Sequence, residues 1–208
     1  NGDSAQGNPL MEANPGGAPC NVLAMLQKLG KKTAFIGKVG NDMFGNQLKK
    51  AVEEVGIDTR NLIMDHKHHT TLAFVHTYPD GDRDFSFYRD PGADMMLTKE
   101  EVQKELIEDS RIFHFGTLSS THEGIREATR HAIELAKEAG CIITFDPNLR
   151  PPLWNSLDDA RREIEYGMGK CDVLKISDNE VEFLFGTTDY DKGAALIREK
   201  YNIPLVLI

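Results

Sequence analysis

Short apolar runs alternate with longer amphipathic segments along most of this 208-residue chain. Glycines follow several of the amphipathic segments, at the points where helices would end. Because strands separated by helices pair in parallel and are covered on both faces, this order predicts an α/β layered fold. The length allows one main domain with a small appendage. We predict strands at 33–36, 112–115, 141–145, 173–176 and 205–208, and helices at 19–29, 44–55, 98–108, 121–139, 157–168, 179–185 and 192–201.

A hairpin pattern interrupts this order. Two strand-like runs, 71–78 and 84–89, flank the turn sequence PDGDR. A hairpin does not easily join a parallel sheet, so we expect it to project as a small β lid with the Gly- and Pro-rich start of the chain. The predicted division is a lid region, residues 1–15 and 70–96, and an α/β core, residues 16–69 and 97–208. Both ends look abrupt, and we expect the chain to be a fragment.

Composition restricts the partners. The chain has 33 acidic and 24 basic residues, and the basic ones are scattered, so we expect no nucleic-acid partner. No stretch approaches the roughly 18 apolar residues of a membrane helix, so we expect no membrane association. Cys20, Cys141 and Cys171 have neither disulfide nor zinc spacing, which favours the reducing cytosol. A small anionic ligand remains compatible with these limits.

A polar cluster follows the predicted strand 141–145, at the edge where open α/β sheets bind ligands. Asp146, Asn148 and Arg150 alternate along a proline-rich segment that could aim all three side chains at one cleft. Arginine suits phosphate or carboxylate because of its planar fork. The alternative is a rigid surface loop with a local ion pair between Asp146 and Arg150, but the position at a strand end favours a site.

A second cluster follows the strand 173–176. Asn179 and Glu182 stand three residues apart at a helix start, so they share one helix face. An amide and a carboxylate there could hold water molecules around Mg²⁺. From spacing alone, capping of the helix N-terminus is the favoured interpretation.

Two glycine-bearing turns surround the first predicted helix. Gly16 and Gly17 precede Asn21, which could bind ligand hydroxyls or cap the helix. The segment 37–45 resembles a phosphate loop superficially but lacks both the Gly-Lys-Ser/Thr ending and the dinucleotide fingerprint. A tight turn with Asp42 as helix cap is therefore favoured there.

Two further groups lie around the hairpin. Arg89, at its end, could close over a polar ligand or remain solvated. His66, His68 and His69 gather in a polar loop before it, where a solvated loop is favoured over a metal site because no further ligand is evident.

Four segments in this order resemble the ribokinase-like (pfkB) carbohydrate kinases, particularly bacterial fructokinases: NPGGAPCN at 14–21, GKVGNDMFG at 37–45, FDPNLRPPLW at 145–154 and KISDNEVE at 175–182. The resemblance runs along essentially the whole chain. It implies a doubly wound, mainly parallel α/β sheet with a β lid, ATP as phosphoryl donor, Mg²⁺ as cofactor and a homodimer joined through the lids. A monovalent cation is left open.

The resemblance also implies roles for particular residues. The sugar side would comprise Gly16, Gly17, Asn21, Arg89, Asp146, Asn148 and Arg150. The cofactor side would comprise Lys175, Asn179 and Glu182, with Glu182 acting on Mg²⁺ indirectly. Because Asn179 and Glu182 match the family's Asn-x-x-Glu motif, the resemblance overrides the capping interpretation.

The implied reaction of the parent protein is phosphorylation of fructose to fructose 6-phosphate, with 2-keto-3-deoxygluconate as an alternative substrate. The family's Gly-Ala-Gly-Asp motif, whose aspartate accepts the sugar hydroxyl proton, does not occur in these 208 residues, nor does the N-terminal strand whose acidic residue binds the sugar. We therefore expect no catalytic base in this chain and no activity from it alone. A chain that truly stopped at Ile208 would be a non-catalytic sugar-binding module.

Overall fold

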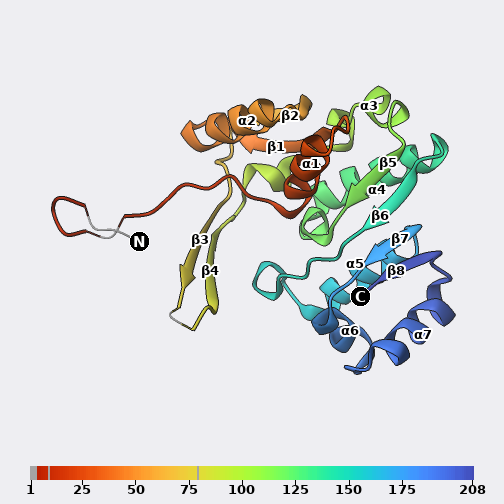
Figure 1. Cartoon of the computed structure of the whole chain (residues 1–208). Coiled ribbons are helices and arrows are strands. Elements are labelled where there is room, and N and C mark those ends of the chain that lie inside the picture. The colour runs from red at the N-terminus through yellow and green to blue at the C-terminus, as the bar shows by residue number, and fades with distance from the viewer. Residues whose placement is uncertain (1–3, 9, 79) are drawn as a thin grey trace.

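The computed structural model describes residues 4–8, 10–78 and 80–208, which form an α/β body with a projecting hairpin (Figure 1). Residues 1–3, 9 and 79, all within the predicted lid region, lie outside the described residues. The helices are α1 Ala18–Lys28, α2 Met43–Val55, α3 Lys104–Glu108, α4 Glu123–Glu138, α5 Leu157–Met168, α6 Asp178–Phe185 and α7 Tyr190–Tyr201. The strands are β1 Ala34–Gly40, β2 Asp58–Asp65, β3 Leu72–Thr77, β4 Arg83–Tyr88, β5 Ile112–Phe115, β6 Ile142–Phe145, β7 Val173–Lys175 and β8 Leu205–Leu207.

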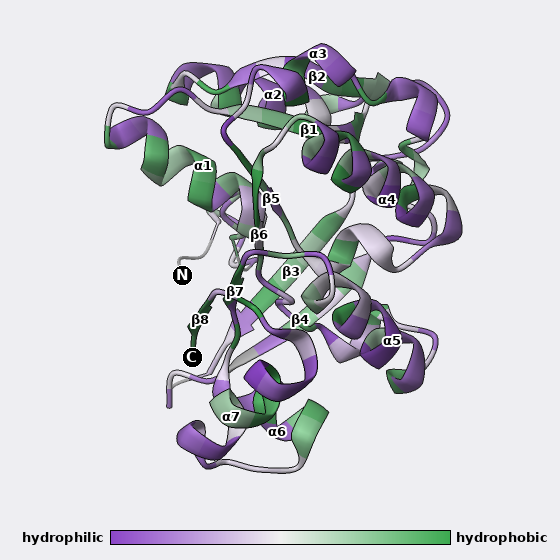
Figure 2. Ribbon diagram, turned by 90° about the vertical axis from the view of Figure 1, so that its right-hand side faces the viewer, coloured by the Kyte–Doolittle hydropathy of each residue, from purple (hydrophilic) through white to green (hydrophobic). Residues whose placement is uncertain are grey.

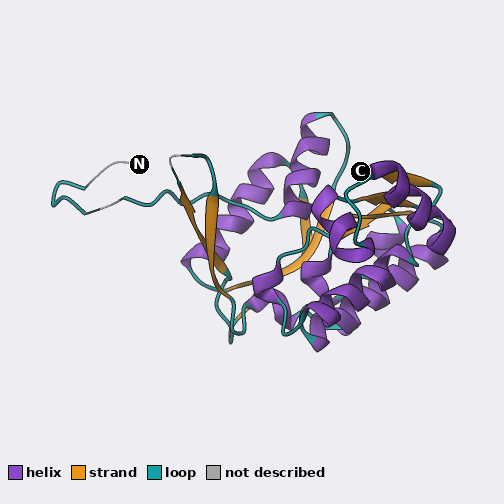
Figure 3. Ribbon diagram, turned by 90° about the horizontal axis from the view of Figure 1, so that it is seen from below, coloured by secondary structure: helices purple, strands orange, loops and turns teal. Residues whose placement is uncertain are grey.

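The parallel strands form two hydrogen-bonded sheets within the described residues. β1 pairs with β2, and β5, β6, β7 and β8 form a four-stranded sheet in that order. Phe145 of β6 lies opposite both Phe115 of β5 and Leu174 of β7, which aligns the carboxyl ends of the three strands. Figure 3 shows these strands lying among the helices. The predicted α/β class with a mainly parallel sheet is confirmed.

The hairpin of β3 and β4 is antiparallel and stands away from the body (Figures 1 and 3). Val75 lies opposite Phe85, and Leu72 lies opposite Tyr88. Residues 4–8 and 10–15, the described part of the remaining predicted lid, form no strand. The hairpin is therefore the part of the predicted lid region that forms strands within the described residues.

The core lies around the four-stranded sheet, where helices α4 to α7 supply most of the covering side chains. Ile143, Phe145 and Leu174 of the sheet are almost completely buried, as are Ile164 of α5 and Ile197 of α7. Burying an apolar side chain of this size stabilises the fold by about 1.5–3 kcal/mol. Figure 2 shows hydrophobic residues along these strands and hydrophilic residues on outer faces of the helices. No helix among the described residues is long and apolar enough to cross a membrane.

One strand was not predicted, and one predicted helix is broken, for a common reason. Asn61 of β2 is fully buried, although it belongs to the polar first half of the strand sequence DTRNLIMD. Its side chain donates to Glu101 O at 2.8 Å and accepts from Gln103 N at 2.8 Å. These bonds hold the backbone extended at Val102, so the predicted helix 98–108 divides into a 3₁₀ turn, Lys99–Glu101, and the short α3.

Candidate active site at the carboxyl edge of the sheet

The turns that follow β5 and β6 are hydrogen-bonded to one another. Asp146 N donates to Phe115 O at 3.2 Å, and Thr117 donates to Pro147 O from its N at 3.2 Å and from its Oγ1 at 2.6 Å. A Cβ atom on Gly116 would lie 2.8 Å from Asp146 O, so this close approach of two backbones requires glycine. The segment carrying Asp146 is thus fixed to the edge of the sheet.

The carboxylate of Asp146 is only partly satisfied. Its Oδ2 lies 3.2 Å from Lys175 Nζ at the end of β7, and its Oδ1 is buried without a hydrogen-bond partner among the described residues. Arg150, half-buried, donates from Nη1 to Leu149 O at 3.0 Å. Asp146 therefore pairs with Lys175, on the neighbouring strand, rather than with Arg150 as the surface-loop alternative would require. A buried acceptor without a protein partner can accept a hydrogen bond from a ligand hydroxyl.

Two neighbours complete this side of the edge. Asn148 is half-buried with φ of 45°, a left-handed conformation that asparagine tolerates better than most residues. His114 of β5 contacts Thr144 Oγ1 through Nδ1 at 2.8 Å. Burial lowers the pKa of His114 below its ordinary value, although the nearby Asp146 carboxylate opposes the shift. A neutral imidazole is therefore favoured beside the Asp146 carboxylate.

Helix α6 begins directly after β7 and presents Asn179 and Glu182, both exposed. Its cap is Ser177, with Glu180 completing a capping box, so Asn179 and Glu182 do not serve as the caps that spacing alone suggested. No group of three or more His, Cys, Asp or Glu in the described part of the chain is placed to hold a metal ion. Asn179 and Glu182 are exposed oxygen donors that could hold water molecules around Mg²⁺ rather than bind the ion directly.

Glu180 is the residue of this edge that the sequence analysis missed. It is 5% exposed, and its Oε1 accepts from Leu149 N at 2.7 Å while its Oε2 accepts from Ser177 N at 2.9 Å. The pattern Ser177-x-x-Glu180 is a capping-box signal and could have indicated the second of these bonds. The bond to Leu149 joins residues 31 positions apart and has no local signal.

The predicted residues at the start of α1 form a separate group. Gly17 is the N-cap of α1 with φ of 116°, so Asn21 is not the cap, and its side chain is exposed. Gly16 is also exposed and has open space around it. Among the described residues, no hydrogen bond joins this group to the segment 146–150.

The segment 37–45 covers the end of β1 and the start of α2, and it has the structural role that was favoured for it, with Asp42 as helix cap. Asp42 caps α2 by accepting from Gly45 N at 2.8 Å, and it also accepts from Thr70 N and Thr70 Oγ1 at 2.8 Å each. Desolvation, which would raise the pKa of Asp42, is outweighed by these hydrogen bonds, so its pKa lies below the ordinary value. A Cβ atom on Gly45 would overlap Gly40 O, and one on Gly40 would lie 2.5 Å from Thr70 N, so packing explains both glycines.

Arg89 is buried at the base of the lid. Its side chain is 6% exposed and donates to Asp94 Oδ2 at 2.7 Å, to Thr121 Oγ1 at 2.7 Å and to Leu118 O at 2.9 Å. The solvated alternative for Arg89 is therefore wrong. These bonds tie the end of β4 to the turn after β5, next to the edge that carries Asp146.

The three loop histidines make separate contacts. His66 Nδ1 lies 3.0 Å from Asn41 Nδ2, and His68 Nδ1 lies 3.1 Å from Asp65 Oδ2. His69 is almost fully exposed and lies 3.6 Å from Asp42. The three side chains thus face different partners.

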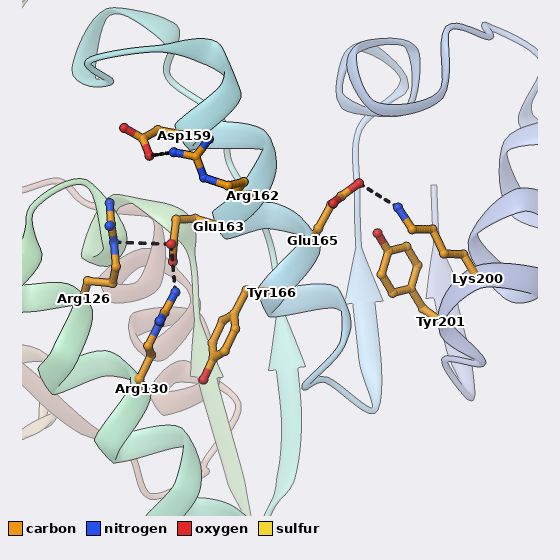
Figure 4. A pocket seen from close by; sticks show the side chains of 9 residues that line it. All are labelled: Arg126, Arg130, Asp159, Arg162, Glu163, Glu165, Tyr166, Lys200 and Tyr201. Carbon is orange, nitrogen blue, oxygen red and sulfur yellow. Dashed lines mark hydrogen bonds and ion pairs between the residues drawn. The ribbon is translucent and has the colours of Figure 1, made fainter.

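A hollow of about 680 Å³ lies elsewhere, between α4, α5 and α7 (Figure 4). Its charges are paired internally: Glu163 with Arg126 and Arg130, and Glu165 with Lys200. Cations already neutralised in this way have little capacity left for an anionic ligand. We therefore place the candidate site at the carboxyl edge of the sheet and not in this hollow.

Comparison with known proteins shows the family of this chain. The sequence profile described as "pfkB family carbohydrate kinase" matches residues 3–208. The chain belongs to the pfkB family of carbohydrate kinases. In this pfkB chain the family segments 145–154 and 175–182 lie on neighbouring strands and meet through Asp146 and Lys175.

Curated relatives and solved structures are similar along nearly the whole chain. Fructokinase-2 of Solanum lycopersicum is 42% identical over 194 residues, which are 93% of this chain and 59% of the relative. The crystal structure of fructokinase with bound ATP from Xylella fastidiosa has a TM-score of 0.83 at 35% identity, over 93% of this chain and 60% of that one. Fructokinase from Vibrio cholerae O395, solved with fructose, ADP and calcium ion, has a TM-score of 0.81 at 31% identity, over 92% of this chain and 61% of that one. The pfkB chain thus spans about 60% of the length of these proteins.

Proposed function

We propose that this pfkB chain is the part of an ATP-dependent fructokinase that holds the sugar and one side of the nucleotide, and that the whole protein converts fructose to fructose 6-phosphate. The observation that carries the proposal is the orphaned, buried Oδ1 of Asp146 beside Lys175 at the edge of a pfkB fold. The similarity to fructokinases along the whole chain supports fructose as the acceptor.

On the sugar side, the hydrogen-bonding capacity of the edge suits a polyol. Asp146 Oδ1 accepts a hydroxyl hydrogen, and Asn148 and Arg150 supply an amide and a guanidinium from the same segment. Arg89, held at the lid base, keeps the hairpin next to this segment. Gly16, Gly17 and Asn21 form the remaining part of the proposed sugar surface.

On the nucleotide side, we assign Lys175, Asn179 and Glu182 to the phosphates of ATP and to Mg²⁺. Lys175 lies at the end of β7, and its ammonium already neutralises one carboxylate at 3.2 Å. Asn179 and Glu182 are exposed oxygen donors on one helix face. Mg²⁺ bound there would neutralise charge on the transferring phosphates, while these side chains hold its water molecules in position.

We further propose a homodimer through the lids. The hairpin exposes Phe74, Val75 and Tyr88. On one face the rings of Phe74 and Tyr88 meet edge to face, with their centroids 5.3 Å apart, and on the other face Val75 lies opposite Phe85. A two-stranded ribbon with apolar side chains on both faces has one face to cover the sugar and a second face to pack against another lid.

The reducing cytosol is the proposed compartment. All three cysteines are free thiols. Burial raises the pKa of Cys20 to about 11 and that of Cys171 to about 12, so both thiols stay protonated and unreactive at neutral pH.

A coupled assay for ADP release tests the proposed reaction. The full-length protein is expected to turn over fructose with ATP and Mg²⁺, with a higher kcat/KM for fructose than for 2-keto-3-deoxygluconate. Residues 1–208 alone are expected to be inactive. Absence of turnover with fructose, or a preference for 2-keto-3-deoxygluconate, would reject fructose as the substrate, and turnover by residues 1–208 would reject the absence of a catalytic base.

A further inference from the structure

An arginine of α5 holds the C-terminal end of α6. Arg161 donates from Nη1 to Leu184 O at 2.8 Å and from Nη2 to Phe183 O at 2.6 Å. The same guanidinium lies over the ring of Phe183, 4.6 Å from its centroid. Because Ala160 and Ile164 on either side of it are fully buried, Arg161 projects from a part of α5 that is fixed in the core. It therefore ties the last turn of α6 to the body of the protein.

The two carbonyls that Arg161 contacts lie beyond the hydrogen bonds that α6 makes within itself. The last carbonyls of any α-helix have no N–H group four residues further along the helix, and α6 is only eight residues long. Gly186 N donates to Glu182 O at 2.8 Å, which is the final bond of this helix. Arg161 satisfies the next two carbonyls and also places a positive charge at the negative end of the helix dipole.

The two ends of α6 are held by different contacts. The first half packs closely on α7, because a Cβ atom on Gly193 would lie 2.6 Å from Val181 Cγ1. The buried residues of α6, Glu180 and Val181, both belong to this half. Phe183 and Leu184 of the last turn are only half-buried. The contacts of Arg161 are therefore a larger share of what holds the last turn than of what holds the first.

We propose that Arg161 is a positioning residue that fixes the last turn of α6, and with it Glu182, for binding of Mg²⁺ and the nucleotide phosphates. The proposal rests on the proposed function, which assigns Asn179 and Glu182 to Mg²⁺. Asn179 lies in the capped first turn, whereas Glu182 accepts the final bond of the helix. Fraying of the last turn would therefore move Glu182 away from Asn179, although neither side chain is altered. Groups that orient the side chains around a metal ion typically contribute about 10- to 100-fold to metal affinity or activity.

The test compares Arg161→Met with the matched control Arg162→Met in the full-length protein. Arg162 is the next residue of α5, but it is exposed and pairs with Asp159 of its own helix. Calorimetry of a non-hydrolysable ATP analogue should show about tenfold weaker binding to Arg161→Met with Mg²⁺, and less than about threefold weaker binding in EDTA. Amide exchange at Gly186 without ligand should become about tenfold faster. Arg162→Met should change none of these values.

A second variant, Arg161→Lys, tests whether the forked contact matters. Lysine keeps the positive charge but cannot stack its planar group on Phe183 while donating to two carbonyls. We expect it to weaken binding of the analogue with Mg²⁺ by about threefold, between wild type and Arg161→Met. If Arg161→Met failed to fold, this variant would decide the question, because wild-type affinity with Mg²⁺ in Arg161→Lys would reject the role of the fork.

Four results would overturn the proposal. Wild-type affinity of Arg161→Met with Mg²⁺ would show that Arg161 has no part in the site. An equal loss of affinity in EDTA would attribute the effect to general destabilisation. Weaker binding with unchanged exchange at Gly186 would show that the effect does not pass through the last turn of α6, and an equal effect in Arg162→Met would attribute it to the lost charge. Failure of the wild-type protein to phosphorylate fructose would instead reject the proposed substrate, and it would leave these nucleotide measurements unaffected.

Discussion

Removal of the Asp42 carboxylate should destabilise the protein strongly, because one side chain satisfies three donors. Asp42 accepts from Gly45 N, Thr70 N and Thr70 Oγ1, each at 2.8 Å, and Thr70 is buried. Loss of a helix cap costs about 1 kcal/mol. Buried donors left without a partner cost a further ~1–3 kcal/mol. We expect Asp42→Ala to lower the free energy of unfolding of the full-length protein by about 2–4 kcal/mol.

Urea denaturation measures this loss as a lower midpoint at an unchanged m-value. Asp42→Asn is the matched control, because asparagine caps helices well but has only one acceptor oxygen; its loss should be about half that of alanine. If Asp42→Ala changed the free energy of unfolding by less than about 0.5 kcal/mol, the claim that Asp42 stabilises the segment 37–45 would be refuted.

The pH dependence of the same variant has a definite sign. The pKa of Asp42 in the folded protein lies below its ordinary value. Its contribution is therefore present above the unfolded pKa of about 3.9 and is lost as the pH falls through the folded pKa. The stability difference between wild type and Asp42→Ala should shrink as the pH falls below the unfolded pKa of about 3.9 and through the lower folded pKa. A constant difference over that range would contradict the assignment.

Three further substitutions test particular contacts. Gly167→Ala would place a Cβ atom 2.5 Å from the buried ring of Phe145. The cost of overpacking, about 1–3 kcal/mol, should exceed the gain in helix propensity of about 1 kcal/mol, so urea denaturation should show a less stable protein. Gly124→Ala is the control: the nearest atoms to its Cβ lie at 3.8 Å, so it should be neutral or stabilising in the same measurement. Arg89→Lys cannot reproduce the forked contacts at the lid base and should cost about 2 kcal/mol in the same measurement while raising KM for fructose. Lys175→Met should change stability by less than about 1 kcal/mol, because the Lys175 side chain is 58% exposed, but should raise KM for ATP about tenfold in a kinase assay. If KM for fructose were unchanged in Arg89→Lys, Arg89 would not belong to the site. If KM for ATP were unchanged in Lys175→Met, Lys175 would not belong to it.

Much of the four-stranded part of the fold follows from the sequence. The strand at 112–115 and helix 157–168 have the predicted bounds, because their apolar periodicity and caps agree with their tertiary contacts. The strand β2 could not be recognised, since its fully buried Asn61 is satisfied only by backbone groups about 40 residues away. The same contact breaks the predicted helix 98–108, so both errors come from one long-range pairing.

For the candidate site, too, some features could be predicted from the sequence and others could not. The positions of Asp146 and of Asn179 at the ends of neighbouring strands follow from strand order, which is readable in the sequence. The pairing of Asp146 with Lys175 and the bond from Leu149 to Glu180 depend on how two loops approach each other in space. No periodicity or motif within either loop encodes that approach.

Hydrogen exchange of the full-length protein with and without substrates tests the central claim most directly. Fructose is expected to slow amide exchange in the segment 146–150, and a non-hydrolysable ATP analogue with Mg²⁺ is expected to slow it at 175–182. Protection by both ligands elsewhere, for example around the hollow between α4, α5 and α7, with neither segment affected, would contradict a site at the carboxyl edge of the sheet.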